Sequence, residues 1–338
     1  MGSEPIIVNG IKIQENPIQD PRRVKIAKVE AQMMECEEKS LFNKGLKLAI
    51  KAISCFPENP TLTYSWAALF YVLLGKNNKS MQTLVEGLTK GAVWSPSFLE
   101  EGFQGLKDHP RFPEILELTR KKFYNNKSLN QAELLVRTPK SYSTSKQYPL
   151  LLVFHGRFDS NAANDIYWGN IIEQKEIFLA LLQSSQMQSK NHFVWDEENK
   201  ALEDLQRALA ILIEHYPINT SEIILAGVSQ GSELALVALF SGFVTATKFI
   251  SVIPAFGGFS YQLSEKDLMQ NKKEKIRGCF IVGERDPRFS KTKTFFELLR
   301  KNGVECRLFS YPELGHQIPD DFDQVLAKAV NFVLKGKL

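Results

Sequence analysis

Apolar and polar residues follow two different rhythms along this chain, and the change lies near residue 130. From Pro21 to about Tyr124, apolar residues recur at the three- and four-residue spacing of amphipathic helices, with little strand character. From Gln131 onward, short apolar runs alternate with amphipathic segments such as 200–216. The pattern therefore predicts a helical segment followed by a longer segment in which strands and helices alternate.

The longer segment has the elements of an α/β sheet. Tyr148–Phe154 (YPLLLVF) is a continuous apolar run, typical of a strand buried on both faces of a parallel sheet. Further strands are expected at 131–138, 177–182, 222–226, 248–253, 276–282 and 305–310, with a polar hairpin loop at 140–147 and helices at 200–216, 232–240, 291–302 and 320–334. This alternation predicts an α/β fold class, a doubly wound and mostly parallel sheet covered by helices on both faces.

A polar stretch at 125–130 divides the two segments. A chain of 338 residues is long enough for one large core and a smaller domain. We therefore expect a leader at 1–20 with one strand at 5–13, an all-α domain at 21–125 and an α/β domain at 131–338.

The predicted helix at 42–53 has small residues on one face: Gly45, Ala49 and Ala52. Small residues let a neighbouring helix approach closely, and prolines at 57 and 60 end the helix. This helix resembles the second helix of a tetratricopeptide repeat, and 64–75 with 79–90 form a degenerate second pair near the 34-residue period. A plain helical bundle explains the spacing equally well. Either arrangement could hold a peptide, a partner protein or the chain's own second domain.

Composition narrows the function. Hydrophobic content of 43% and charged content of 24% are those of a globular protein, and a formal charge of +4 is too small to indicate nucleic-acid binding. The longest apolar run, 66–74, is too short to span a bilayer. The four cysteines lack zinc-ligand spacing and fit a reducing compartment, and no secretory signal is evident at 1–19. We expect a cytoplasmic protein.

The stretch 221–233 (SEIILAGVSQGSE) contains the motif Gly-x-Ser-x-Gly between a predicted strand and a predicted helix. A serine at so tight a turn has strained backbone geometry and an exposed hydroxyl. Gly227 and Gly231 lack the β-carbons that would collide where strand and helix pass each other. An ordinary strand-to-helix turn could carry the same motif, but this context favours Ser229 as a nucleophile.

A serine nucleophile needs a base, and the base needs an orienting carboxylate. Of the five histidines, only His316 lies in the loop between the last predicted strand and the last predicted helix, where such a base is delivered. Asp286 follows the strand at 276–282 at the same edge of the sheet, and Glu284 is the alternative acid. The order Ser229, Asp286, His316 is that of α/β-hydrolases.

The loop after the first core strand begins at His155 and should provide an oxyanion donor. Acyl transfer places negative charge on the former carbonyl oxygen, and two fixed backbone N–H groups stabilise it. The candidate donors are the amides of Gln230 and Arg157. The Arg157 side chain could either recognise an acidic substrate group or pair with Asp159. His155 is expected to shape the loop only.

Aromatic residues near the same sheet edge are candidates for substrate binding: Trp168, Phe256 and Phe259. They suggest a pocket for an apolar acyl or aryl group. Aromatic side chains at a sheet edge are equally often plain packing, so both interpretations stay open.

The motifs together resemble those of the α/β-hydrolase superfamily. His155-Gly156, the serine turn at 227–231, Asp286 and His316 match its pattern, and Ser-Gln-Gly with the upstream Phe-Val-Trp at 193–195 is most similar to the phospholipase/carboxylesterase and acyl-protein thioesterase branch. The resemblance covers 131–338 and implies hydrolysis of an ester or thioester through an acyl-enzyme, without metal or cofactor. The Arg-Phe pair at 157–158 and the preceding helical domain depart from that pattern and leave the substrate open.

Two functions of different classes follow. The chain is either a serine hydrolase of a small-molecule ester or thioester, or a helical-repeat scaffold that binds a protein or peptide and keeps a catalytically silent hydrolase fold. The complete set of Ser229, Asp286 and His316 favours the hydrolase, since a scaffold has no need of it. The sequence has no phosphate-binding loop, dinucleotide-binding turn or H-E-x-x-H helix to indicate a nucleotide or metal enzyme.

Overall fold

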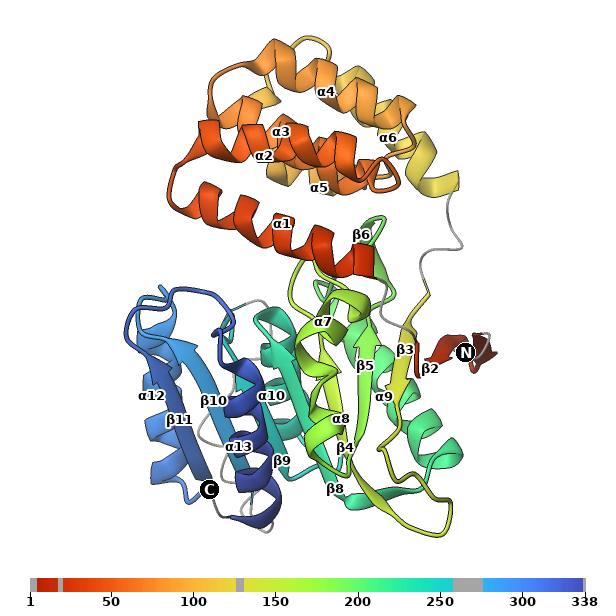
Figure 1. The fold of residues 1–338 in the computed structure, drawn as a ribbon, viewed down its shortest axis with the longest axis vertical. Coiled ribbons are helices and arrows are strands. Elements are labelled where there is room, and N and C mark those ends of the chain that lie inside the picture. The colour runs from red at the N-terminus through yellow and green to blue at the C-terminus, as the bar shows by residue number, and fades with distance from the viewer. Residues whose placement is uncertain (1–4, 18–20, 126–130, 258–275, 337–338) are drawn as a thin grey trace. The chain divides into compact units, whose positions relative to one another are not determined.

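The chain forms two compact units. The computed structural model describes residues 5–17, 21–125, 131–257 and 276–336. The sheet unit comprises 1–18, 131–186 and 193–338, and the helical unit comprises 19–130 and 187–192. Figure 1 shows the elements of both units. Residues 126–130 of the expected linker lie outside the described residues.

The helical unit is built from six α-helices and one short 3-10 helix within its described residues: α1 (Pro21–Glu38), α2 (Phe42–Cys55), α3 (Pro60–Leu73), α4 (Asn77–Thr89), α5 (Pro96–Gly102), η1 (Gln104–Leu106) and α6 (Phe112–Asn125). Helix α3 packs between α2 and α4 because both neighbours have glycine at the contact. A β-carbon at Gly45 would lie 2.2 Å from Phe70 Cζ, and one at Gly87 would lie 2.8 Å from Tyr64 Cβ. This packing is compatible with both a tetratricopeptide-like repeat and a plain bundle, so the repeat stays a prediction.

The tip of one hairpin also belongs to the helical unit. The hairpin consists of β6 (Gln186–Ser189) and β7 (His192–Val194). Within the helical unit, the Ser95 amide donates to the Gln188 carbonyl at 2.6 Å and the Lys190 amide donates to the Val93 carbonyl at 3.1 Å. The sequence pattern did not predict this division, because hydrogen bonds between distant backbone groups leave no periodic signal.

The sheet unit has one large mixed sheet. Its described strands run in the order β1-β2-β3-β5-β4-β8-β9-β10-β11. Their bounds are β1 (Ile6–Val8), β2 (Ile11–Glu15), β3 (Glu133–Arg137), β4 (Tyr148–Phe154), β5 (Phe178–Gln183), β8 (Ile218–Val228), β9 (Lys248–Val252), β10 (Arg277–Gly283) and β11 (Glu305–Tyr311). Among these described strands, the β1–β2 and β3–β5 pairs are antiparallel and the other pairs are parallel.

The leader joins this sheet instead of standing apart. The single strand expected at 5–13 is an antiparallel pair, β1 and β2, and β2 continues into parallel pairing with β3. Ile11 and Ile13 alternate on β2, are 0% and 2% exposed and belong to the main core, which explains why the segment is held there.

The strands β3 and β4 do not form the hairpin expected around 140–147. Strand β5 lies between them, antiparallel to β3 and parallel to β4. A polar loop predicts a turn but not the partner of the next strand. Because β4 is apolar throughout, it is buried on both faces and takes parallel neighbours on both sides, β5 and β8.

Helices cover both faces of the sheet, so the α/β fold class with a doubly wound, mostly parallel sheet is confirmed. One core contains residues of α9 (Glu198–His215), α10 (Gln230–Phe240) and α12 (Phe289–Lys301). The other contains residues of α7 (Asn161–Trp168), α8 (Ile171–Gln174) and α13 (Phe322–Lys335). Strand β4 separates them, since Leu150 and Leu152 belong to the first core and Leu151 and Val153 to the second.

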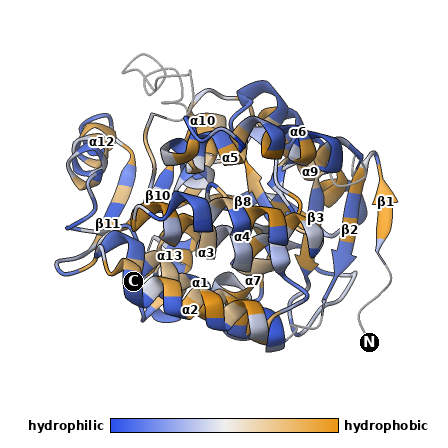
Figure 2. Cartoon of the chain, turned by 90° about the horizontal axis from the view of Figure 1, so that it is seen from above, coloured by the Kyte–Doolittle hydropathy of each residue, from blue (hydrophilic) through white to orange (hydrophobic). Residues whose placement is uncertain are grey.

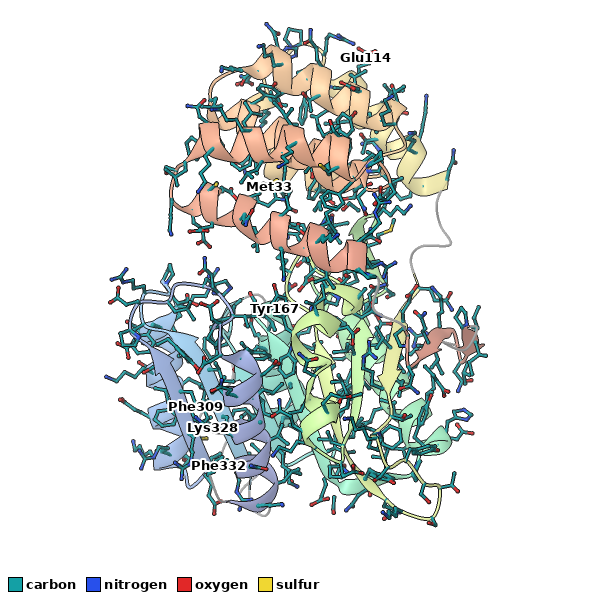
Figure 3. All side chains as sticks on the ribbon, in the orientation of Figure 1. Met33, Glu114, Tyr167, Phe309, Lys328 and Phe332 are labelled. Carbon is teal, nitrogen blue, oxygen red and sulfur yellow. The ribbon has the colours of Figure 1, made fainter. Side chains whose placement is uncertain are left out.

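Helix α13, which packs on the core that contains Leu151 and Val153, is amphipathic. In α13 the residues toward the sheet are buried, and Figure 2 shows apolar and polar positions interspersed along this helix. Phe309 of β11 and Phe332 of α13 pack on the same core, and Lys328 lies on α13 near them in Figure 3. The packed helices leave the carboxyl ends of β4, β8, β9, β10 and β11 to carry the candidate site.

Candidate active site

Ser229 occupies a strained turn between β8 and α10. Its backbone has φ +53° and ψ −114°, a region that residues other than glycine rarely adopt. The turn is held because the Ser229 amide donates to the Val252 carbonyl at 2.9 Å. The Ser229 carbonyl accepts hydrogen bonds from the amides of Glu233 and Ala255, each at 3.2 Å. The backbone at Ser229 is therefore fixed by both β9 and α10.

The two glycines of the turn permit a close approach that no other residue would allow. A β-carbon at Gly227 would lie 2.4 Å from the carbonyl carbon of Gly231. A β-carbon at Gly231 would lie 2.3 Å from the carbonyl oxygens of both Phe154 and His155. The motif therefore brings α10 directly against the end of β4, which places Ser229 beside the loop after that strand.

The hydroxyl of Ser229 is the first member of a hydrogen-bonded series. Ser229 Oγ lies 2.9 Å from His316 Nε2, and His316 Nδ1 lies 2.6 Å from Asp286 Oδ2. A carboxylate only accepts hydrogen bonds, so we assign the proton to Nδ1 and the acceptor role to Nε2. In that tautomer, Nε2 is ready to take the proton of the serine hydroxyl.

Asp286 is buried and ionised. Its side chain has no exposed surface, whereas the His316 side chain is 26% exposed. Burial acts to raise the pKa of the Asp286 carboxyl, but hydrogen bonds from His316 and from the Arg288 amide outweigh it and hold the pKa below its ordinary value of 3.8. The carboxylate is therefore a fixed negative charge behind the imidazole.

Asp286, and not Glu284, contacts His316 in this structure. The Glu284 side chain accepts from the Ser310 hydroxyl at 2.7 Å. The two loops are joined closely, since the Arg285 amide donates to the Leu314 carbonyl at 3.0 Å and a β-carbon at Gly283 would lie 2.1 Å from the same oxygen. The loop that carries Asp286 therefore packs directly against the loop that carries His316.

The loop after β4 reaches the serine through Gly156. A β-carbon at Gly156 would lie 3.7 Å from Ser229 Cβ, so the loop after β4 passes close to the Ser229 side chain. The Arg157 guanidinium pairs with Asp196, with Nη2 2.9 Å from Oδ2. The guanidinium thus has a carboxylate partner within the protein.

The predicted substrate-binding aromatics fall in three different settings. Trp168 is fully buried and packs edge-on against Phe322 at 5.1 Å between ring centroids, a core position. Phe256 is partly buried and packs against Phe295 at 5.4 Å. Phe259 lies outside the described residues. Only Phe256 is thus described at a partly open position.

Sequence reasoning missed Trp195 and Asp196 as site residues. The sequence marks Trp195 only as part of the Phe-Val-Trp run, and no motif includes Asp196. Asp196 accepts hydrogen bonds from both Arg157 and Gln230, the two residues proposed to supply oxyanion donors. An aspartate directly before a predicted helix is an ordinary sequence, so nothing local marks it.

No group of three or more His, Cys, Asp or Glu residues in the part of the chain that the structure describes is arranged to hold a metal ion. Among the helices within these described ranges, none is both long and apolar enough to cross a membrane.

The fold of this chain has counterparts among known proteins. The model of the dienelactone hydrolase family matches residues 163–328, a span that contains Ser229, Asp286 and His316. An uncharacterised protein from Bacillus cereus is 21% identical, with a TM-score of 0.53 over 92% of this chain and 99% of its own. The chain has the α/β-hydrolase fold. The resemblance of its motifs to this superfamily is confirmed, and the coverage of 92% extends the structural likeness beyond the sheet unit.

Two esterases of known structure are also similar to this chain. Esterase PE8 is 15% identical, with a TM-score of 0.49 over 59% of this chain and 97% of its own. An esterase from Pyrobaculum calidifontis is 14% identical, with a TM-score of 0.46 over 60% of this chain and 80% of its own. No curated protein sequence matches this chain.

Proposed function

We propose that this protein is a serine hydrolase that cleaves a carboxylic ester or thioester through an acyl-enzyme. The observation that carries the proposal is the series Ser229 Oγ to His316 Nε2 at 2.9 Å and His316 Nδ1 to Asp286 Oδ2 at 2.6 Å. A strained nucleophile, a base within hydrogen-bond distance and a buried orienting carboxylate are the three requirements of such a mechanism.

In the acylation step, Ser229 Oγ attacks the carbonyl carbon of the substrate while its proton passes to His316 Nε2. The imidazolium that forms is stabilised by the Asp286 carboxylate, which remains ionised. His316 then returns the proton from Nε2 to the departing alcohol, or to the sulfur of a departing thiol. The products of this step are the free leaving group and an ester of Ser229.

In the deacylation step, water repeats the attack. His316 Nε2 takes a proton from the water as its oxygen attacks the acyl carbon, and then gives that proton back to Ser229 Oγ. The carboxylic acid is released and Ser229 is regenerated. Each proton transfer uses one nitrogen of one residue, which fits the single tautomer assigned to His316.

The negative charge of each tetrahedral intermediate needs two fixed donors. The backbone amides of Gln230 and Arg157 fit this role, because Gln230 begins α10 next to Ser229 and Arg157 follows Gly156 beside the serine. The amino terminus of α10 adds a partial positive charge at the same place. Phe256 is a candidate for contact with the acyl group.

A second candidate is a scaffold whose helical unit binds a protein or peptide, with a silent sheet unit. The strained backbone at Ser229 weighs against this alternative, because it costs conformational free energy and a scaffold has no structural need of it. The tight fit between Gly231 and the end of β4 belongs to the same turn.

The proposed reaction is tested by a panel of p-nitrophenyl esters of graded chain length alongside acyl-coenzyme A thioesters. We expect turnover of at least one class, with a burst of leaving group equal to the enzyme concentration if deacylation is slow. The matched control is Ser229→Ala under the same conditions. No turnover of any substrate by the wild-type chain, with an intact fold, would favour the scaffold.

A further inference from the structure

Two consecutive residues between β7 and α9, Trp195 and Asp196, contact both loops that carry the proposed oxyanion donors. On the basis of the proposed function, we infer that Asp196 is a positioning residue that holds the Gln230 and Arg157 amides at a fixed separation. Asp196 forms hydrogen bonds with Arg157 and Gln230 and not with Ser229 or His316, so it would act through Arg157 and Gln230.

The first link fixes Gln230. Its side-chain carbonyl accepts from the Trp195 amide at 3.0 Å, and its side-chain NH₂ donates to Asp196 Oδ1 at 2.8 Å. Gln230 is 4% exposed, so water does not replace these bonds easily. The dipeptide Trp195-Asp196 therefore holds both the oxygen and the nitrogen of the Gln230 side-chain amide. Gln230 is the residue that directly follows Ser229.

The second link fixes Arg157. Its Nε donates to Asp196 Oδ1 at 3.2 Å and its Nη2 donates to Asp196 Oδ2 at 2.9 Å, a forked pairing that restricts both distance and direction. The guanidinium also lies over the Phe158 ring at 4.3 Å from its centroid. One carboxylate thus bridges the loop after β4 and the first residue of α10.

The third link orients the peptide after Gly156. Trp195 donates its indole N–H to the His155 carbonyl at 2.9 Å and stacks on the imidazole at 4.7 Å. His155 Nε2 accepts from the Ser184 amide at 3.2 Å, so Nδ1 carries the proton and donates to the Gly156 carbonyl at 2.7 Å. Burial lowers the pKa of His155 to about 4, which keeps the ring neutral.

This orientation determines where the Arg157 amide points. The Gly156 carbonyl faces the His155 ring, and the N–H of a planar trans peptide points the opposite way from its carbonyl. The Arg157 N–H is therefore directed away from His155. Trp195 thus holds the backbone at His155, and Asp196 holds the Arg157 guanidinium and the Gln230 side chain.

The exposure of the Arg157–Asp196 ion pair separates a structural role of Asp196 from a positioning role. The pair is partly exposed, with side-chain exposures of 36% for Arg157 and 37% for Asp196. Pairs of this kind contribute little to stability. Removal of the carboxylate costs stability mainly at Gln230, whose buried side-chain NH₂ loses its acceptor, so the thermal midpoint should fall only modestly while the two donors loosen. The matched control is Glu305→Gln, which breaks the Arg277–Glu305 pair between β10 and β11.

The experiment measures kcat, KM and the inhibition constant of a trifluoromethyl ketone, which forms a tetrahedral adduct with a negatively charged oxygen. For Asp196→Ala we expect kcat to fall roughly ten- to a hundredfold, with KM within about twofold. A displaced donor loses only part of its stabilisation of the transition state, whereas a deleted donor loses all of it. The inhibition constant should rise by the same factor as kcat/KM falls. Asp196→Asn keeps an acceptor for Gln230 and should recover most of kcat.

Each result decides the inference. It is overturned if Asp196→Ala keeps kcat/KM within twofold of wild type, if Glu305→Gln loses as much, or if the inhibition constant does not follow kcat/KM. If Asp196→Ala fails to fold, Asp196→Ser takes its place, because a serine side chain is too short to bridge Gln230 and Arg157, and a kcat/KM within twofold of wild type for that variant overturns the inference. Wild-type chain that neither turns over an ester nor reacts with the ketone contradicts the proposed function itself, and the inference falls with it.

Discussion

His316 donates its Nδ1 proton to Asp286 across 2.6 Å, and the Asp286 side chain has no surface exposed to water. Hydrogen bonds from His316 and from the Arg288 amide, the latter at 2.8 Å, stabilise the negative charge of this carboxylate. Because an imidazole held in this way presents Nε2 to Ser229, the loop after β10 determines how well the base works.

Asp286→Asn should preserve the fold and lower kcat by about 10⁴, because an amide neither stabilises imidazolium nor holds the same tautomer. The measurement is steady-state kinetics with the best ester of the panel, accompanied by circular dichroism. Glu284→Gln is the matched control, since Glu284 bonds to Ser310 and not to His316. The roles of the two acids would be exchanged if Glu284→Gln lost activity and Asp286→Asn did not.

The stability contributed by Asp286 should depend on pH in one direction. Its folded pKa lies below the ordinary value of 3.8, so the native state holds the charged form more tightly than the unfolded state does. This stabilisation is fully present above the ordinary pKa and is lost as the pH falls through the folded pKa. Urea unfolding from pH 7 to pH 2.5 should show the gap between wild type and Asp286→Asn narrowing below about pH 4. A gap that widened on acidification would contradict the assigned direction.

Gly231→Ala should destabilise the protein by about 3 kcal/mol or more, because its β-carbon would overlap the backbone oxygens at the end of β4 at 2.3 Å. Backbone cannot move aside as a flexible side chain can. Urea unfolding gives the free energy, and Gly102→Ala is the control, since a β-carbon at Gly102 has no atom within 4 Å. Equal stability of the two variants would mean that α10 does not approach β4 so closely.

Much of the fold was predictable because periodicity reports burial. The strand Tyr148–Phe154 has the predicted bounds, and the serine turn follows a strand and opens a helix as its motif requires. The positions of Asp286 and His316 followed from one rule, that loops at the carboxyl ends of parallel strands meet at one edge.

Pairing and local contacts were less predictable. The insertion of β5 between β3 and β4, and the addition of β2 to the sheet, depend on which distant strand is available and not on the local pattern. Asp196 shows the same limit for the site, because its two partners lie 39 and 34 residues away. Trp168 looked like a pocket wall but fills the core, since an aromatic residue gives the same local signal in both places.

Removal of the first 130 residues should weaken the sheet unit, although every proposed catalytic group lies in the remainder. The truncated chain 131–338 lacks β1 and β2, so β3 loses its parallel partner and becomes an exposed edge. We expect reduced solubility and a lower thermal midpoint, with Ser229 still reactive. A chain that retains 1–18 and replaces 19–130 with a flexible linker should recover part of that loss. Wild-type solubility for the truncated chain would show that β2 matters little.

The most direct measurement of the central claim is reaction with a fluorophosphonate probe followed by mass spectrometry of the peptide that contains Ser229. The account predicts a single adduct on Ser229, its loss in Ser229→Ala, and activity of that variant below about a hundredth of wild type with nearly unchanged thermal stability. An adduct on another residue, no adduct on the folded wild-type chain, or more than a hundredth of the activity in Ser229→Ala would contradict the assignment of Ser229 as nucleophile.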